Sequence, residues 1–177
     1  MNHPQNQVTA KKIIFRKASS ADIPSMQKFI FEHGSNPWNF LPENAVKAHI
    51  ADIKTQKVHA FLAEIEGECV GFACFYFGIP SNCQKYEEDQ PQNSAYLSEI
   101  VVDRQYAGKG IGSGLINTLK DFLIAHGTKR LYTERHADNP GSTGVMRKTG
   151  FKIVEEFFDP ERRPEGSQKT TVLRLEF

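Results

Sequence analysis

The stretch that decides the fold is Tyr96-Leu-Ser-Glu-Ile-Val-Val-Asp-Arg-Gln-Tyr-Ala-Gly-Lys-Gly-Ile-Gly-Ser-Gly-Leu-Ile-Asn117. Its apolar, β-branched beginning predicts a strand, and its end predicts the start of an amphipathic helix. Gly108, Gly110 and Gly112 lie between the two and remove every second side chain there. Backbone N–H groups and the positive end of the helix are then left facing outward together, which favours the binding of an anion.

The spacing of the glycines disfavours two common phosphate sites. A Walker loop needs Ser or Thr after Gly-Lys so that a hydroxyl reaches magnesium, but Gly110 follows Lys109 here. A dinucleotide fingerprint needs the spacing G-x-G-x-x-G, whereas these glycines recur at a strict interval of two. A merely flexible glycine loop is the remaining alternative, and it would also have to explain the flanking strand and helix patterns.

Residues 102–112, Val-Asp-Arg-Gln-Tyr-Ala-Gly-Lys-Gly-Ile-Gly, resemble the acetyl-CoA loop of the GNAT superfamily of N-acetyltransferases. In that loop an Arg or Gln, two residues, Gly, one residue and Gly follow the fourth strand. Ala107 stands in the Arg/Gln position of this chain, and counting from Gln105 instead would displace the loop by two residues. Because the loop binds mainly through backbone groups, we expect Ala107 to weaken the match without breaking it.

A second stretch is similar to the same family. The family pattern of Asn, a small residue, an apolar residue, Lys and Gly-Phe is matched by Asn139, Ser142, Val145, Lys148, Gly150 and Phe151. The resemblance implies that Asn139 and the helix after it lie beside the pantetheine arm and the sulfur of acetyl-CoA. Gly150-Phe151 alone would also fit a helix stop before another strand, but that interpretation does not account for Asn139 and Ser142.

The resemblance covers nearly all of the chain and implies a GNAT-like α/β fold. We expect a mixed, mostly antiparallel central sheet of about six or seven strands with helices on both faces. Residues 1–177 would form a single acetyltransferase domain, with residues 1–12 as a flexible N-terminus. Apolar patterns place strands near 13–16, 58–65, 69–77, 95–102, 130–136, 152–158 and 170–177. They place helices after residue 22, from 43 to about 55, from 111 to 125, and before residue 150.

Composition narrows the class of function. The formal charge is +1, from 22 Lys and Arg against 21 Asp and Glu, so we expect no nucleic-acid partner. The three cysteines lack C-x-x-C spacing, which indicates neither a zinc site nor a disulfide framework and favours the cytoplasm. Cys69 and Cys74 are an odd number of positions apart, so a regular strand would place them on opposite faces. No signal peptide and no run of roughly 18 apolar residues is present, so we expect no membrane association.

The resemblance also implies which residues hold acetyl-CoA, the expected cosubstrate. Backbone groups of the loop would bind its pyrophosphate, namely those of Ala107, Gly108, Lys109, Gly110, Ile111, Gly112 and Ser113. The backbone of Ile100, Val101 and Val102 would pair with the pantetheine like an added strand. In the family a bulge in this strand directs an N–H at the acetyl carbonyl, a role that falls here to Ile100 or Val101.

Glu99 is the candidate general base for acetyl transfer to an amine. It lies in an otherwise apolar strand, immediately before the residues expected to pair with the cofactor, and partial burial would raise its pKa. The alternative is that Glu99 pairs with a neighbouring Arg or Lys and is structural. Glu134 and His136, on the adjacent expected strand, are the reserves.

The acid that would protonate the leaving thiolate is less well defined. Many members of the family use a tyrosine in the helix before Gly-Phe, but Met146 stands in that position. Tyr132 and Tyr106 are the nearest candidates by sequence. The reaction can also proceed without a dedicated acid, because a thiol of pKa about 8.5 leaves largely as the thiolate.

The acceptor is expected to be a primary amine of a small molecule or a peptide, and its identity is not readable from the sequence. No cysteine is placed as an acyl carrier, which favours direct attack in a ternary complex. Trp38 and Phe40 either line the acceptor site or pin their loop to the core, and residues 78–93 form a substrate-side flap or a solvated loop. The sequence leaves open whether two copies of the chain form a homodimer. The alternative function is a non-enzymatic acyl-CoA-binding or sensing module.

Overall fold

The computed structural model describes residues 11–81, 83 and 93–177 of the chain. Within these residues one sheet contains seven strands in the order β1-β2-β3-β4-β5-β7-β6. The strands are β1 (Ile13–Lys17), β2 (His59–Ile65), β3 (Glu68–Phe77), β4 (Ser94–Val102), β5 (Arg130–His136), β6 (Lys152–Phe158) and β7 (Lys169–Glu176). Only the β4–β5 pair is parallel among them, so the predicted mixed and mostly antiparallel sheet is confirmed.

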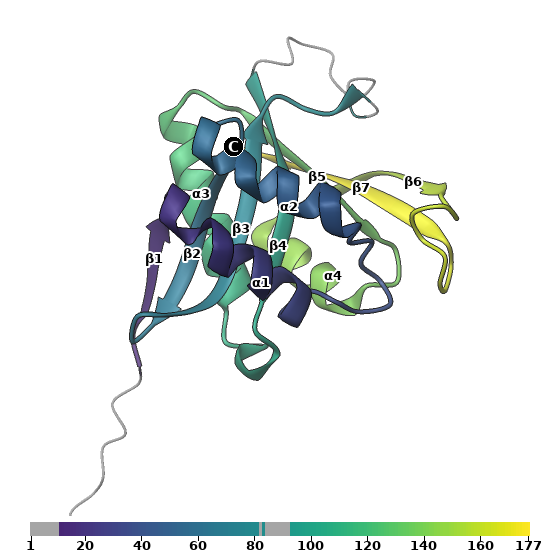
Figure 1. Ribbon diagram of the computed structural model, residues 1–177. Coiled ribbons are helices and arrows are strands. Elements are labelled where there is room, and N and C mark those ends of the chain that lie inside the picture. Colours follow the sequence, from purple (N-terminus) through teal and green to yellow (C-terminus); the bar gives the residue numbers. More distant parts are fainter. Residues whose placement is uncertain (1–10, 82, 84–92) are drawn as a thin grey trace, which may run out of the picture.

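Helices cover both faces of the sheet, as predicted (Figure 1). α1 (Ile23–His33) and α2 (Glu43–Ala51) pack on one face, where Met26, Ile30 and Ile50 are fully or almost fully buried. α3 (Ile111–Ala125) and α4 (Pro140–Thr149) lie on the other face, and α3 buries Leu115, Leu119 and Leu123 there. Short 3-10 turns complete the described helices at Ser20–Asp22, Asp52–Thr55 and Arg104–Tyr106. The predicted second helix therefore ends as a 3-10 turn after Ala51.

The parallel strands β4 and β5 are paired only at their beginnings and separate toward the glycine loop. The two strands pair only from Ser94 to Tyr96, opposite Arg130 to Tyr132. One residue further on, the side chain of Thr133 donates a hydrogen bond of 2.9 Å to the carbonyl oxygen of Leu97. Beyond this bond no ladder pair joins the strands within the described residues. The β5-facing edge of the second half of β4 is thus available for another extended chain.

Two β-bulges change which side chains share a face. In β4 the ladder to β3 pairs Phe75 with Leu97 but Cys74 with Glu99, so Ser98 is an extra residue. In β3 the ladder to β2 shifts between Cys69 and Gly71. The second bulge overturns the expectation for the cysteines, because Cys69 and Cys74 both pack in the cluster under α1 and α2. An extra strand residue reverses the alternation on which that expectation depended.

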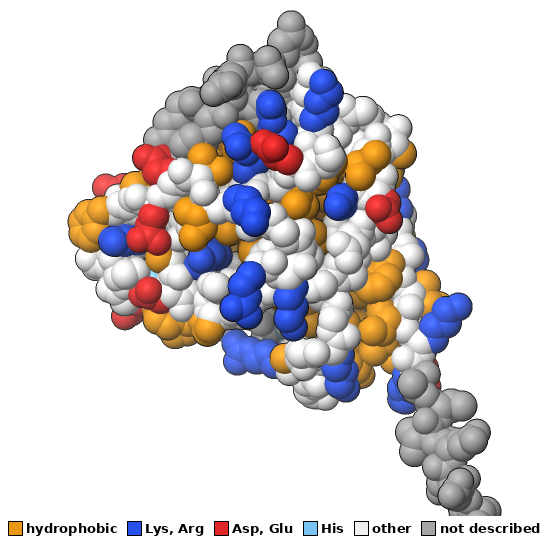
Figure 2. Space-filling model, turned by 180° about the vertical axis from the view of Figure 1, so that it is seen from behind, with side chains coloured by type: hydrophobic (Ala, Val, Ile, Leu, Met, Phe, Trp, Pro, Cys, Tyr) orange, Lys and Arg blue, Asp and Glu red, His pale blue; other side chains and the backbone are white. Residues whose placement is uncertain are grey.

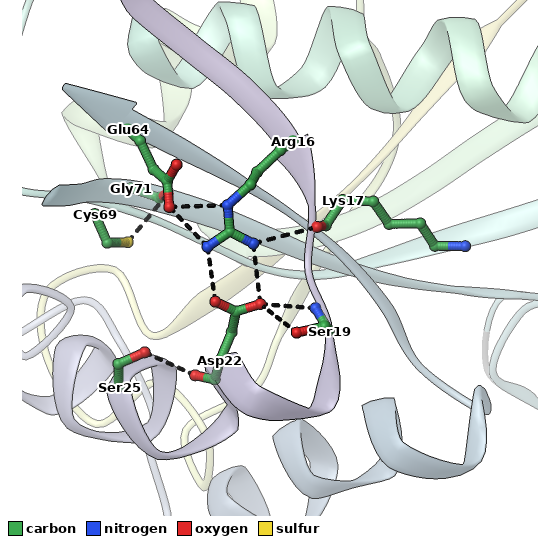
Figure 3. A network of polar contacts seen from close by, with 8 residues as sticks. All are labelled: Arg16, Lys17, Ser19, Asp22, Ser25, Glu64, Cys69 and Gly71. Atoms are coloured by element: carbon green, nitrogen blue, oxygen red, sulfur yellow. Dashed lines mark hydrogen bonds and ion pairs between the residues drawn. The ribbon is translucent and has the colours of Figure 1, made fainter. Parts of the chain in front are cut away.

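A network around Arg16 connects β1, β2 and the start of α1 (Figure 3). The Arg16 guanidinium donates to both carboxylate oxygens of Asp22, at 3.0 and 2.7 Å, and its Nε donates to Glu64 at 2.9 Å. Asp22 also accepts hydrogen bonds from the backbone and the hydroxyl of Ser19. The hydrogen bonds from Arg16 hold the pKa of Asp22 well below its usual range. These contacts fix the chain reversal between β1 and α1.

Parts of two predicted segments lie outside the described residues. These are the beginning of the N-terminus, residues 1–10, and most of the predicted flap, residues 82 and 84–92. Ile79 and Cys83, at the start of the latter segment, pack against Tyr132 and Val172. A search of the described helices finds none with the length and apolar character needed to cross a membrane.

Candidate functional site

A cavity of about 640 Å³ lies where β4 and β5 separate. The glycine loop and α4 line it from the α3–α4 side of the sheet, and the α1–α2 connection lines it from the opposite side. The predicted site residues in its wall are Glu99, Ile100, Val101, Val102, Ala107, Gly108, Gly110, Ile111, Gly112, Ser113, Asn139 and Ser142. Lys109 is the one predicted site residue that does not line the cavity. Its ammonium lies 4.7 Å from the centre of the Tyr106 ring. The tertiary structure therefore brings the two motifs and Glu99 to one site.

The glycine loop presents the N-terminus of α3 to this cavity. Gly110 precedes the helix with φ of 80°, a left-handed conformation that favours glycine. The N–H of Gly114 donates to the carbonyl of Gly110, so the N–H groups of Ile111, Gly112 and Ser113 have no acceptor within the helix. These three groups and the helix dipole form a site suited to a phosphate.

Close packing holds this helix end against β1. A Cβ atom at Gly114 would lie 2.2 Å from Cζ of Phe15 in β1, so a larger residue requires the Phe15 ring to move.

Two hydrogen bonds order the loop before α3. Asp103 accepts a hydrogen bond of 2.9 Å from the N–H of Gln105 and so orders the start of the loop. Arg104 donates to the carbonyl of Ser35, which ties the loop to the α1–α2 connection.

Asn139 acts as the cap of the second helix at the site. Its side-chain oxygen accepts a hydrogen bond of 3.1 Å from the N–H of Ser142, the second residue after Pro140. The same interaction starts α4 in the cavity wall. The local role of Asn139 is therefore to position the first turn of α4, and a contact with the cofactor stays a prediction.

Glu99 lies in the cavity wall, where its carboxylate is partly buried. Among the described residues, no hydrogen bond or ion pair joins its carboxylate to another group. Desolvation by burial raises the pKa of Glu99 to about 7, and the positive charge of Arg163 partly opposes this rise. The alternative that Glu99 is neutralised by a neighbouring Lys or Arg thus lacks a partner in the described part of the chain.

The two reserve residues are held in structural contacts. Glu134 is an ion-pair partner of Arg162 at 2.8 Å, and its side chain is only 4% exposed. His136 accepts from the N–H of Asp138 at Nδ1, at 3.0 Å, and its Nε2 lies 2.9 Å from the carbonyl oxygen of Glu165. This arrangement assigns the proton to Nε2 and leaves no free acceptor nitrogen on His136. Neither residue is arranged to take a proton from an amine.

The residues considered for the acid occupy different positions. Met146 is buried in the core and also reaches the cavity wall, and it carries no proton to donate. Tyr132 is fully buried and lies outside the wall, whereas Tyr106 lies within it. Tyr96, which the sequence did not single out, also lines the cavity, and desolvation raises its pKa well above the usual value.

The α1–α2 connection forms the wall opposite the cofactor loop. Phe40 lines the cavity and is 51% exposed, which is compatible with a place in the acceptor site. Trp38 instead packs edge-on against the His136 ring with 4.8 Å between ring centres. The side chains of Asn36 and Asn39 both donate to the carbonyl of Gly34, which shapes the turn. Phe40 is thus available to an acceptor, whereas Trp38 supports the wall behind it.

Arg162 and Arg163 are cavity residues that sequence reasoning missed. Both belong to the segment between β6 and β7, which the sequence presented as a charged turn. No local pattern distinguishes an arginine that faces a cavity from one that faces solvent. Their position follows only from the way in which this segment folds back toward β5.

Comparisons with known proteins agree with this geometry. The model of the acetyltransferase (GNAT) family matches residues 23–151. A spermine/spermidine N(1)-acetyltransferase of Bacillus subtilis (strain 168) is 30% identical over 89 residues, which cover 50% of this chain and 55% of the relative. An L-2,4-diaminobutyric acid acetyltransferase of Nocardia farcinica is 26% identical over 114 residues, which cover 59% of this chain and 54% of the relative. The chain spans about half the length of these curated relatives.

A solved structure shows the same fold over almost the whole chain. The structure of yncA from Salmonella typhimurium with its cofactor acetyl-CoA superimposes with a TM-score of 0.70 at 17% identity. The superposition covers 93% of each chain. The match to the family model extends over more than half of the sequence and includes both motifs that line the cavity. The chain therefore belongs to the acetyltransferase (GNAT) family.

Proposed function

We propose that the protein is an acetyl-CoA-dependent N-acetyltransferase that acts on a primary amine by direct attack in a ternary complex. The observation that carries the proposal is the position of Glu99. Its carboxylate, with a pKa raised to about 7, shares one cavity with the N-terminus of α3. A base poised near neutral pH and a phosphate site are the two groups that this reaction needs.

The residues of the cavity fit acetyl-CoA, which would supply the thioester carbonyl that accepts the amine. The N–H groups of Ile111, Gly112 and Ser113 would hold the pyrophosphate. The unpaired edge of β4 at Ile100–Val102 would hydrogen-bond the pantetheine as an extended chain. Figure 2 shows the face of the molecule that is turned away from the viewer in Figure 1, and Lys and Arg side chains are spread over its centre. This distribution of positive charge suits an anionic cofactor.

The chain's own groups would then move the proton. Glu99 accepts a proton from the acceptor amine, directly or through one water, as the nitrogen attacks. The bulge at Ser98 lies immediately before Glu99 and two residues before Ile100, and it supports the proposal that an N–H of Ile100 or Val101 stabilises the oxyanion. The leaving thiolate needs no strong acid, although Tyr106 and Tyr96 lie in the same wall.

Direct attack is favoured over an acyl-enzyme because of where the cysteines lie. Cys69, Cys74 and Cys83 form no disulfide within the described residues, and none of them is among the residues that line the cavity. Burial raises the pKa of Cys69 and that of Cys74, so neither is an activated nucleophile. The lack of a disulfide among the described cysteines also suits the reducing conditions of the cytoplasm, where we propose that the protein works.

The names of the two relatives suggest two classes of acceptor. One relative is named for polyamines, which carry only cationic groups, and the other for a diamino acid, which also carries a carboxylate. We propose that the acceptor of this chain is likewise a small amine or a peptide amine.

The proposal is tested with purified protein, acetyl-CoA and a panel of amines, by following the release of free CoA thiol. We expect turnover with at least one acceptor and its loss in Glu99→Gln with unchanged CoA affinity. Binding of CoA without turnover of any polyamine, amino acid or peptide amine would instead indicate an acyl-CoA-binding module. A chain that does not bind CoA would contradict both functions.

A further inference from the structure

Arg163 is a buried cation in the cavity wall, and it has no ion-pair partner among the described residues. Its residue surface is only 9% exposed, yet it contributes to the cavity wall. Its Nε donates a hydrogen bond of 3.0 Å to the hydroxyl of Thr170, which in turn donates to Asp159 at 2.6 Å. No hydrogen bond or ion pair of its terminal nitrogens is found within the described part of the chain. The guanidinium is therefore held in place through Nε, and its terminal edge is left for a ligand.

The neighbouring Arg162 shows the opposite situation. Arg162 forms ion pairs of 2.8 Å with Glu134 and with Asp159. These two carboxylates also attract Arg163, but both are already engaged directly by Arg162. Desolvation lowers the pKa of Arg163, which reflects the cost of holding a charge there. A buried guanidinium is stabilised when an anion approaches its open edge.

Within the described residues, Glu99 is the carboxylate of the cavity wall that has no ion pair, because Glu134 is paired with Arg162. Arg163 attracts the Glu99 carboxylate electrostatically, but the two do not form an ion pair within the described residues. One group comes from β4 and the other from the segment between β6 and β7, so they approach the cavity from two separate elements. The acceptor amine belongs beside Glu99, and an anionic part of the same acceptor belongs beside Arg163.

We propose that Arg163 binds a carboxylate of the acceptor, so that the substrate is a primary amine that also carries a carboxylate. This inference rests on the proposed N-acetyltransferase function. The two terminal nitrogens of a guanidinium match the two oxygens of a carboxylate in a bidentate pair. A polyamine has no such group, and its additional ammonium would be repelled by Arg163. Arg163 is thus a residue that determines acceptor specificity.

The experiment compares acceptors that differ only in the carboxylate. L-lysine is paired with cadaverine, L-ornithine with putrescine, and short peptides with free carboxyl ends are paired with their amides; spermidine represents the polyamines. We expect kcat/KM to be at least tenfold higher for the carboxylate member of the preferred pair. Arg163→Gln should remove that preference by raising KM for the carboxylate acceptor at least tenfold, with less than a threefold change for its partner.

Two further variants separate recognition from a general loss of structure. Arg163→Lys keeps the charge but not the planar fork, so it should restore part of the preference. Arg174→Gln removes an arginine of β7 that pairs with Glu176 and does not line the cavity, and it should leave the preference unchanged. CoA affinity should be the same in all variants. Because the charge of Arg163 lowers the pKa of Glu99, Arg163→Gln should move the rising limb of kcat/KM to higher pH for both members of a pair, so the acceptors are compared on the plateau above that limb.

The outcomes distinguish this inference from the proposed function. Equal kcat/KM within each pair, a preference for spermidine, or equal losses for both members in Arg163→Gln would overturn the role of Arg163 and leave the acetyltransferase intact. If no acceptor releases CoA thiol, the proposed function fails. Calorimetric titration of the same acceptors into the protein–CoA complex then tests Arg163 directly. Absence of carboxylate-dependent binding, or binding unchanged in Arg163→Gln, would overturn the inference.

Discussion

Glu99 lies opposite Cys74 across the β3–β4 ladder, one residue after the extra residue Ser98 in β4. The hydroxyl of Ser98 donates to the carbonyl of Cys74 at 3.1 Å and lies 2.7 Å from Nε2 of His49 in α2. The bulge is thus held from two sides. This support holds Glu99 beyond the last paired residues of β4 and β5, where it is partly buried and has no ion-pair partner among the described residues.

The pH dependence of turnover should report the ionisation of Glu99. Only the carboxylate form accepts a proton, so kcat/KM should rise with pH and level off above an apparent pKa near 7. Glu99→Gln should lower kcat/KM by about 10²- to 10⁴-fold and remove this limb of the profile. Steady-state rates between pH 5 and 9 test the prediction. A variant that keeps activity within threefold would exclude Glu99 as the base.

The pH dependence of stability should show the cost of ionising Glu99. The folded-state pKa of about 7 lies above the ordinary glutamate pKa of 4.5, so the folded state holds the proton more tightly than the unfolded state. This contribution to stability is present below pH 4.5 and is lost as the pH rises through 7. Glu99→Gln should therefore gain stability relative to the wild type between pH 5 and 8, by up to about 3 kcal/mol.

Urea unfolding at pH 5 and pH 8 measures that change. Glu176→Gln is the matched control, because the Glu176 side chain is 60% exposed and should show no comparable gain. A stability difference between wild type and Glu99→Gln that does not vary with pH would show that Glu99 ionises normally.

The Arg16 network should stabilise the fold at neutral pH. Asp22→Asn removes the bidentate partner of Arg16, and we expect it to lower the free energy of unfolding by about 1–3 kcal/mol at pH 7. Because the folded-state pKa of Asp22 is depressed, its contribution is fully present above the unfolded pKa and is lost as the pH falls from there through the folded-state pKa. Denaturation at pH 7 and at pH 2 should show a smaller loss at the lower pH.

Glu43→Gln is the control for this network, since it breaks the exposed Glu43–Lys47 pair in α2. Exposed pairs of this kind contribute little, so its effect should be much smaller than that of Asp22→Asn. Equal effects of the two substitutions would mean that the Arg16 network is only a surface contact.

Gly114 should be intolerant of a side chain because of Phe15. Gly114→Ala places a Cβ 2.2 Å from the Phe15 ring, and we expect a loss of about 1–3 kcal/mol from the displaced ring. Phe15→Leu should cost stability alone but recover part of the loss in the double variant. Gly144→Ala in α4 is the matched control, since its Cβ would meet nothing within 4 Å and should not destabilise the helix. Additive losses in the Phe15–Gly114 cycle would contradict direct contact.

Local patterns predicted most of the elements because their causes are local. α3 (Ile111–Ala125) and β5 (Arg130–His136) have the bounds expected from apolar periodicity and the Gly127 stop. The family and the arrangement of the sheet were also predicted correctly, since both motifs are contiguous in sequence. The faces of Cys69 and Cys74 were predicted wrongly, because a bulge depends on the register between two strands.

The sequence by itself determined the glycine loop, the strand that leads into it and the position of Glu99 beside it. Only the tertiary structure decided which carboxylates are neutralised. Glu134 forms an ion pair with Arg162, 28 positions away in the sequence, whereas Glu99 contacts no cation directly within the described part of the chain. It likewise decided that Arg163 faces the cavity rather than solvent. Charge pairing and desolvation depend on distances between separate elements, and those distances are set by the folded packing of β4, β5 and the β6–β7 segment.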